Sequence, residues 1–432
     1  MARSYQLTRR DYLRMAALGV GLGAGSASWL PTLAAAESTQ PQKTSKAVIL
    51  LWLSGGPATI DMWDLKPGSP NGGEFKEIAT ATPGLRISEH LPKLAQQSED
   101  LAVIRSMQSK EGDHRRATQF VRTGYTPQGA IKFPTFGSLC SHEIGNREID
   151  LPSFVSISGG RGGGGGGSLG GGFLGPEFSP LVIGGGNDGG LSVPNLSRRD
   201  GVSEDDQRQR MEMLNKLDAR FRQDRSGQVV DALETAADKA VRLMRPEAAA
   251  AFRLEDEPDQ LRDRYGRNNF GQGCLMARRL VERGITFVEV TLGGWDTHNE
   301  NFEQVAQLSA TLDTAFSTLL ADLKSQGLLD STVVICQGEF GRTPKINGRA
   351  GRDHWPHTWA TVLAGGGIQG GQAIGATNAD GTEVVDRPIT VPDVIATVCQ
   401  QIGIDPKKQN MSNVGRPIRV ADPEAKPIEE LL

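Results

Sequence analysis

Short apolar runs recur along the chain, and each ends in glycine or a small polar residue. They cover residues 47–56, 101–107, 154–160, 286–294, 332–338 and 361–367. Because these runs are continuously apolar and do not alternate with polar residues, they predict strands that are buried on both faces, as in a parallel sheet.

Apolar residues at three-to-four spacing between these runs predict helices. Residues 301–327 show this spacing and end in Gly327, and residues 391–403 show it with Pro392 near the start and Gly403 at the end. Proline is tolerated in a first helical turn, and glycine commonly ends a helix. The alternation predicts an α/β fold, a central and largely parallel sheet flanked by helices, with ligands bound beyond the carboxyl ends of its strands.

Two segments interrupt this pattern. Residues 159–190 form a glycine-rich loop, which we interpret as a surface lid or insert. It contains no Gly-Lys-Ser/Thr sequence, so the pattern does not indicate a phosphate-binding loop. Residues 203–265 are charged and helical in pattern, and they predict a helical insertion whose charged face contacts solvent.

The N-terminal segment predicts an export signal. Thr8-Arg9-Arg10-Asp11-Tyr12-Leu13-Arg14 precedes a mild apolar stretch that ends at Ala34-x-Ala36. A twin arginine followed by a short apolar region and a small-residue site is typical of a twin-arginine signal, here residues 1–36. The mature chain, residues 37–432, contains no other candidate membrane span, so we expect a folded protein that the twin-arginine translocon delivers to the periplasm or cell envelope.

Composition narrows the possible partners. The chain has 47 basic and 51 acidic residues, a balance that does not favour nucleic acid as a partner. Its four cysteines are scattered and form no Cys-x-x-Cys pair, which argues against a thiolate metal site. We expect buried free thiols, with one disulfide as the alternative in an oxidising compartment.

Histidines and carboxylates gather after two of the predicted strands. Asp296 and His298 lie two residues apart just after residues 286–294, and in an extended segment both side chains project to one side. They are candidate ligands of one divalent metal ion. The alternative is that Asp296 caps the following helix and that His298 packs at its start.

A second group follows residues 332–338. Asp353, His354 and His357 lie in an irregular stretch, where His354 is the preferred metal ligand and Asp353 can orient a ring. Glu339 is a candidate second carboxylate ligand, and the Arg342 guanidinium suits a phosphate or sulfate oxyanion. As alternatives, the histidines bind backbone only, and Glu339 pairs with Arg342.

Two further groups remain open at this point. Asp113 and His114 begin a helical pattern that includes Arg115 and Arg116, and a helix N-terminus with basic side chains can bind an anion. Alternatively, Asp113 only caps that helix. Asp61 and Asp64 follow the first strand and can supply a carboxylate or lie in a plain turn.

Long motifs over essentially the whole mature chain resemble the bacterial DUF1501 family, exported proteins of planctomycete type in the alkaline phosphatase and sulfatase superfamily. The motifs that carry the resemblance are GGPATIDMWDLKPG, GDHRRATQFVRTGY, GGFLGPEFSPLVIG, YGRNNFGQGCLMARRLVERG, GGWDTHNENF and EFGRTPKINGRAGRDHWP. The resemblance implies an alkaline-phosphatase- or sulfatase-like sheet with a metal centre at its strand ends. The implied metal ligands are Asp296, His298, Glu339 and His354.

The chain departs from the superfamily pattern at three places. His114 stands where the resemblance implies a Cys, Ser or Thr nucleophile. Ser54-Gly55-Gly56 replaces the metal-binding Asp expected after the first strand, and Phe340 replaces a histidine after Glu339. An altered or one-metal site is therefore expected.

These observations lead to two functional hypotheses. The first is an exported, metal-dependent hydrolase of sulfate or phosphate esters, on small molecules or polysaccharides, with Zn, Ca or Mn as the ion. Arg342 and Arg115 would bind the oxyanion, and His114 would act as attacking group or general base. The alternative is a non-catalytic binding or scaffold protein of the envelope that keeps the fold and one structural ion.

Overall fold

The computed structural model describes residues 46–158, 170–185, 190–192 and 245–432, with scattered positions between 201 and 243. The compact unit that these residues form runs from Ser45 to Leu432. The expected signal at 1–36 lies outside the described residues, as do 159–169 and 186–189 of the glycine-rich segment. The rest of that segment contains short 3-10 turns and one strand.

A nine-stranded sheet forms the centre of the fold, in the order β13-β4-β12-β9-β1-β8-β5-β6-β7. Its pairs are parallel except those of β12 with β4 and β9, and of β6 with β7. The predicted class, a largely parallel sheet flanked by helices, is therefore confirmed. The strands are β1 (Ala47–Ser54), β4 (Leu101–Met107), β5 (Phe154–Ser158), β6 (Leu181–Gly185), β7 (Leu191–Ser192), β8 (Phe287–Gly293), β9 (Thr332–Gln337), β12 (Trp359–Ala364) and β13 (Gln372–Ile374).

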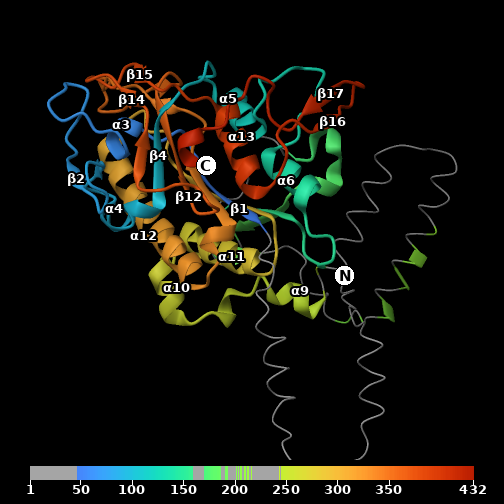
Figure 1. Cartoon of the computed structure of the whole chain (residues 1–432). Coiled ribbons are helices and arrows are strands. Elements are labelled where there is room, and N and C mark those ends of the chain that lie inside the picture. The colour runs from blue at the N-terminus through green and yellow to red at the C-terminus, as the bar shows by residue number, and fades with distance from the viewer. Residues whose placement is uncertain are drawn as a thin grey trace, which may run out of the picture. The chain divides into compact units, whose positions relative to one another are not determined.

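Helices cover both faces of the sheet, and small two-stranded ribbons lie around it (Figure 1). The helices are α3 (Thr59–Met62), α4 (Pro92–Gln96), α5 (His114–Thr123), α6 (Phe136–Ile144), α9 (Pro246–Ala250), α10 (Asp259–Tyr265), α11 (Asn269–Glu282), α12 (Asn301–Ser325) and α13 (Val391–Ile402). The ribbons pair β2 (Glu77–Ala79) with β3 (Arg86–Ser88), β10 (Gly341–Arg342) with β11 (His354–Trp355), β14 (Ala376–Thr377) with β15 (Val384–Asp386), and β16 (Gln409–Met411) with β17 (Pro417–Arg419).

The central strand β1 explains why the apolar runs are continuous. Ile49 and Leu51 belong to a core that contains buried residues of α11 and α12, whereas Leu50 and Trp52 belong to a second core with residues of α5, α6 and α13. Successive side chains of a strand point to opposite faces, so a strand between two cores is apolar at every position.

The two helices predicted from spacing are present, with ends set by glycine. Helix α12 stops at Ser325, two residues before Gly327, and Gly403 caps α13 in a left-handed conformation. At the start of α13, Thr390 and Asp393 cap each other's backbone N–H groups, which satisfies donors that a first turn leaves free.

The described part of the 203–265 segment contacts helices α11 and α12 through an ionic network. Glu257 lies between Arg278, at 2.9 Å, and Arg279 of helix α11. Arg278 also contacts Asp322 of α12 at 3.0 Å, and Tyr265 donates to the same carboxylate at 2.8 Å. Within the described ranges, no helix is long and apolar enough to cross a membrane.

The cysteines allow a direct test of this packing. All four are free and buried, and burial raises the pKa of each thiol, that of Cys399 to about 12. A thiol reacts as the thiolate, so we expect no labelling of the native protein by an aromatic disulfide reagent and labelling of all four thiols after unfolding in guanidinium. Rapid labelling of a native cysteine would contradict the packing described.

Candidate metal centre

Segments from distant parts of the chain converge beyond the carboxyl ends of the parallel strands. Asp296 follows β8, Glu339 follows β9, and His114 begins α5 a few residues after β4. His354 arrives on β11, which pairs with β10 so that Arg342 and His354 lie opposite each other. This is the edge at which α/β sheets bind ligands.

Gly55, directly after β1, permits this convergence. Its φ of +118° is unfavourable for other residues, and a Cβ there would lie 2.4 Å from the backbone nitrogen of Asp296. The Gly55 N–H donates to Glu339 Oε1 at 3.0 Å. The glycines that replace the expected Asp after the first strand thus let three strand ends meet.

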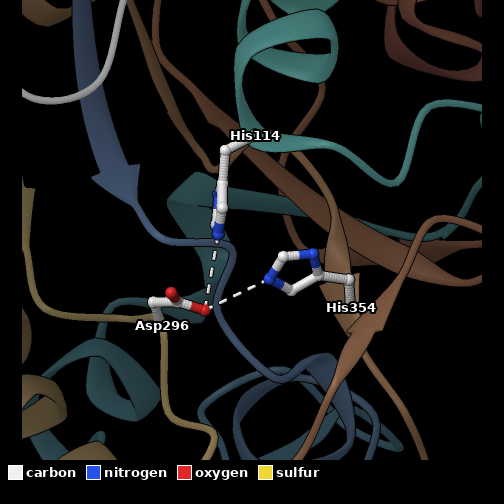
Figure 2. A group of neighbouring side chains, drawn as sticks. All are labelled: His114, Asp296 and His354. Carbon is white, nitrogen blue, oxygen red and sulfur yellow. Dashed lines mark hydrogen bonds and ion pairs between the residues drawn. The ribbon is translucent and has the colours of Figure 1, made fainter.

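Three imidazoles surround one carboxylate oxygen. The Nε2 atoms of His114, His298 and His354 lie 3.4, 3.1 and 3.3 Å from Asp296 Oδ1. Figure 2 shows His114 and His354 pointing at this oxygen from two sides. Ligand atoms of His114, Asp296 and His354 all lie within 4.8 Å of one another, and His298 Nε2 is 3.1 Å from His354 Nε2.

The other ring nitrogen of each histidine contacts a group that only accepts hydrogen bonds. The Nδ1 of His114 lies 2.7 Å from Glu339 Oε1, and that of His298 lies 2.8 Å from Asp353 Oδ1. His354 Nδ1 lies 2.9 Å from the carbonyl oxygen of Gly112. Carboxylates and carbonyls cannot donate, so each Nδ1 carries a proton and each ring presents its Nε2 atom toward Asp296.

This arrangement calls for a positively charged occupant. The Nε2 atoms of His298 and His354 lie 3.1 Å apart, beside the Asp296 carboxylate. One proton can bridge only one such pair, whereas a divalent metal ion can accept all of them. Tetrahedral Zn²⁺ has bonds of about 2.0–2.1 Å, which places its ligand atoms about 3.3 Å apart. Four of the six separations within this donor set, 3.1 to 3.4 Å, match that value, and the ligand atoms of His114, Asp296 and His354 lie within 4.8 Å of one another.

Charge around the centre shapes the ionisation of its groups. Burial raises the pKa of Asp296, but the Arg342 guanidinium and the imidazoles outweigh burial and lower this pKa to about 2. The Glu339 hydrogen bond raises the pKa of His114. Burial lowers the pKa of His354, and the His298 hydrogen bond lowers that of Asp353. Asp296 is therefore ionised at neutral pH.

Three of the four predicted ligands, Asp296, His298 and His354, lie together, whereas the fourth, Glu339, contacts His114. Glu339 contacts the Nδ1 atom of His114, and its Oε2 atom is buried without a hydrogen-bonding partner among the described residues. His114, expected as attacking group or general base, presents its Nε2 atom beside those of the other two imidazoles. Sequence spacing could not distinguish these roles, because both depend on which ring nitrogen is already bound.

Arg342 is buried and its donors are engaged within the protein. The guanidinium binds the carbonyls of Gly55, Gly56 and Arg352 and the Asp296 carboxylate. It pairs with Asp296 and not with Glu339, the partner considered from sequence. These contacts use four of its five N–H groups and the side chain is 0% exposed, so its expected contact with an oxyanion would require the guanidinium to move.

The remaining predicted residues lie around the centre. Arg115 is exposed beside His114 on α5. Asp113 caps that helix, since its side chain accepts from the Arg116 N–H at 3.1 Å. His357 is exposed and packs edge-on against Trp355, with ring centroids 4.7 Å apart.

A buried ion pair that the sequence did not indicate holds the loops of the centre together. Arg352 donates to both oxygens of Asp61 at 2.7 and 2.8 Å, and both side chains are 0% exposed. Asn301 also donates to Asp61, and the Arg352 backbone N–H donates to Thr297 O at 3.0 Å. Asp61 thus supports the loop before His298 and the loop before His354. Asp64, the other candidate after β1, pairs with Lys66 at 2.9 Å.

Asn347 is a second residue that sequence reasoning missed. Its amide donates to the carbonyl of His298 at 3.0 Å and to Asp353 at 3.3 Å, while its oxygen accepts from Arg349 and Gly351 N–H groups. A Cβ at Gly351 would lie 1.9 Å from His298 O, so the two loops touch backbone to backbone. The only signal was the Asn-Gly-Arg-Ala-Gly-Arg run, which marks a tight loop.

The sequence matches the family described as "Protein of unknown function (DUF1501)" over residues 45–432, and no curated protein matches it. Similar solved structures include the PsFucS1 sulfatase from Pseudoalteromonas sp., with a TM-score of 0.38 and 15% identity over 87% of this chain and 70% of that one. A protein in the alkaline phosphatase superfamily from Vibrio parahaemolyticus has values of 0.37 and 15%, over 84% and 68%. The lipoteichoic acid synthase LtaP from Listeria monocytogenes has 0.36 and 10%, over 88% and 75%. At these values the similarity transfers no activity or substrate.

The Asp61–Arg352 pair can be tested by Asp61→Asn, which leaves the buried guanidinium without a charged partner. Removing one member of a buried ion pair costs about 3–5 kcal/mol of unfolding free energy. Urea denaturation measures this loss, with exposed Asp330→Asn as a control that changes stability by less than about 0.5 kcal/mol. Equal stability of the two variants would rule out the anchoring role of the pair.

Proposed function

We propose that this chain, which belongs to the DUF1501 family, is a metal-dependent hydrolase of phosphate or sulfate esters. One observation carries the proposal: three imidazole lone pairs and one carboxylate oxygen meet at separations of 3.1 to 3.4 Å. Such a group of acceptors is unfavourable without a cation. The ester class, on small molecules or on polysaccharides, follows from the resemblance of the long motifs to the sulfatase-like superfamily.

The residues that would hold the metal are His114, His298, His354 and Asp296. A donor set of three nitrogens and one oxygen favours zinc among the expected ions, because calcium prefers six to eight oxygens and manganese prefers carboxylate and water. When bound, such an ion supplies Lewis-acid polarisation of an ester oxygen and activation of water. We therefore propose a one-metal centre of altered ligand composition.

The chain's own residues would orient this centre and stabilise charge. Glu339, Asp353 and the Gly112 carbonyl keep the Nδ1 protons in place, so that all three Nε2 atoms remain available. Arg342 forms an ion pair with Asp296 and offsets its negative charge. Exposed Arg115, next to His114, remains the candidate for contact with the ester oxyanion, a role to which its fixed positive charge is suited.

A structural metal centre in a non-catalytic envelope protein is the second candidate. The observation that favours it is the number of protein donors, since four protein ligands close a tetrahedral shell, as in structural zinc sites. Catalytic zinc sites keep one position open. In a hydrolase one position at the ion would be open to water or ester, whereas in a scaffold Asp296 would occupy it.

Metal analysis of the purified protein, with a panel of aryl phosphates and aryl sulfates, tests the proposal. We expect about one zinc ion per chain and ester hydrolysis that is lost on chelation and restored by zinc. His298→Ala and His354→Ala should lose most of the metal, whereas His357→Ala, a histidine outside the group, should keep it. A protein inert with the metal restored is a scaffold, and full metal content in His298→Ala refutes the ligand assignment.

We also propose export to the periplasm or cell envelope through the twin-arginine translocon, on the strength of Arg9 and Arg10 ahead of the apolar stretch. Replacing both by lysine keeps the charge but removes the paired guanidinium groups. Cell fractionation should then show the protein retained in the cytoplasm as the longer precursor. Unchanged export of the Arg9→Lys/Arg10→Lys variant would exclude this route.

A further inference from the structure

Glu339 is a buried carboxylate whose ion-pairing neighbour is the His114 imidazole. It is 2% exposed, and its Oε1 atom accepts from the Gly55 N–H at 3.0 Å and from His114 Nδ1 at 2.7 Å. Its Oε2 atom has no hydrogen-bonding partner within the described ranges. A buried charge is strongly unfavourable unless an opposite charge lies near it, so this carboxylate needs an explanation.

The charges around the centre supply one. Three carboxylates contact the imidazoles. The Asp296 oxygen lies beside all three rings, Glu339 contacts His114, and Asp353 contacts His298. Arg342 is the only lysine or arginine among the described residues that forms an ion pair with any of these carboxylates. The other groups that can balance these carboxylates are the imidazoles themselves or a cation held by them. Glu339 lies one imidazole away from the position such a cation would take.

Burial separates Glu339 from Asp353, which makes the same kind of contact. Both carboxylates accept from a histidine Nδ1, at 2.7 and 2.8 Å, but the Asp353 side chain is 53% exposed. Solvent screens an exposed charge and weakens its effect on a neighbour, whereas a buried charge acts at nearly full strength. The His114 ring is thus held by a much stronger electrostatic partner than the His298 ring.

We propose that Glu339 is the positioning residue of the metal centre: it fixes the Nδ1–H tautomer of His114 and so keeps the Nε2 atom of that ring available to the ion. The proposal rests on the metal centre of the proposed function and assigns Glu339 a place outside the coordination shell. The buried Glu339 carboxylate therefore acts on the ion through the His114 ring.

Glu339→Gln tests this role, because glutamine keeps the size of the side chain and an oxygen that can accept from His114 and Gly55. Loss of an orienting carboxylate behind a ligating histidine typically lowers metal affinity about 10- to 100-fold. Competition with a chelator should show a fall of this size for zinc. The absorption spectrum of the cobalt(II) form should change as well, since the spectrum reports ligand geometry.

Thermal unfolding of the metal-free protein separates a positioning role from a general structural one. Glutamine keeps an acceptor for both hydrogen bonds of Glu339, so metal-free Glu339→Gln should unfold close to the wild-type temperature, and the rise on adding zinc should be smaller. Asp353→Asn, the matched control, should lose less affinity than Glu339→Gln. A drop in metal-free stability with unchanged zinc affinity, or a larger loss in Asp353→Asn, overturns the proposal.

The outcomes also separate this inference from the proposed function. A wild-type protein that binds neither zinc nor cobalt removes the metal centre itself, and the role of Glu339 with it. A wild-type protein that binds zinc while Glu339→Gln binds it equally well keeps the metal centre and overturns only the positioning role.

Discussion

The ion pair between Asp61 and Arg352 is the contact on which the rest of the centre depends. Asp61 lies in a short helix directly after β1, and Arg352 lies in the loop that leads to His354. Both are fully buried, and the guanidinium also binds the carbonyls of Asn71, Thr343 and Pro344. Burial raises the pKa of Asp61, and the charge and hydrogen bonds of Arg352 oppose that rise. A buried pair of this kind costs free energy to form, but it leaves little alternative to one arrangement of the loops.

Around this anchor the chain concentrates groups that repel one another. Three imidazoles with inward lone pairs, the Asp296 carboxylate and the buried Glu339 carboxylate lie beyond the ends of three neighbouring strands. Hydrogen bonds from Gly55 and Arg342 hold two of these carboxylates in place without neutralising the whole group. Unfavourable local contacts of this kind, held in place by rigid surroundings, are common at functional sites. The sheet and the Asp61–Arg352 pair provide those surroundings.

Much of the fold could be predicted from the sequence, because its main signals are local. The continuous apolar character of β1 reports two cores, and the spacing of α12 and α13 reports one buried face each. The strand β12 carries the same apolar signature as its neighbours but runs antiparallel to β4 and β9. Burial on both faces does not encode strand direction, so this could not be read from the pattern. The roles within the centre were harder still: Asp296 and His298 were identified together because their spacing is short, whereas Arg352 and Asn347 act across loops and carry no spacing signal.

The sequence by itself determined the α/β architecture, the strand-end placement of the candidate ligands, and the choice of Asp296, His298 and His354. These follow from periodicity and from residue type, which are properties of neighbouring positions. Only the tertiary structure decided that His114 joins them, that Glu339 stands behind His114, and that Arg342 serves Asp296. The physical reason is that each side chain has few donor and acceptor atoms. Which of them remain free is settled only when every partner from distant segments has been placed.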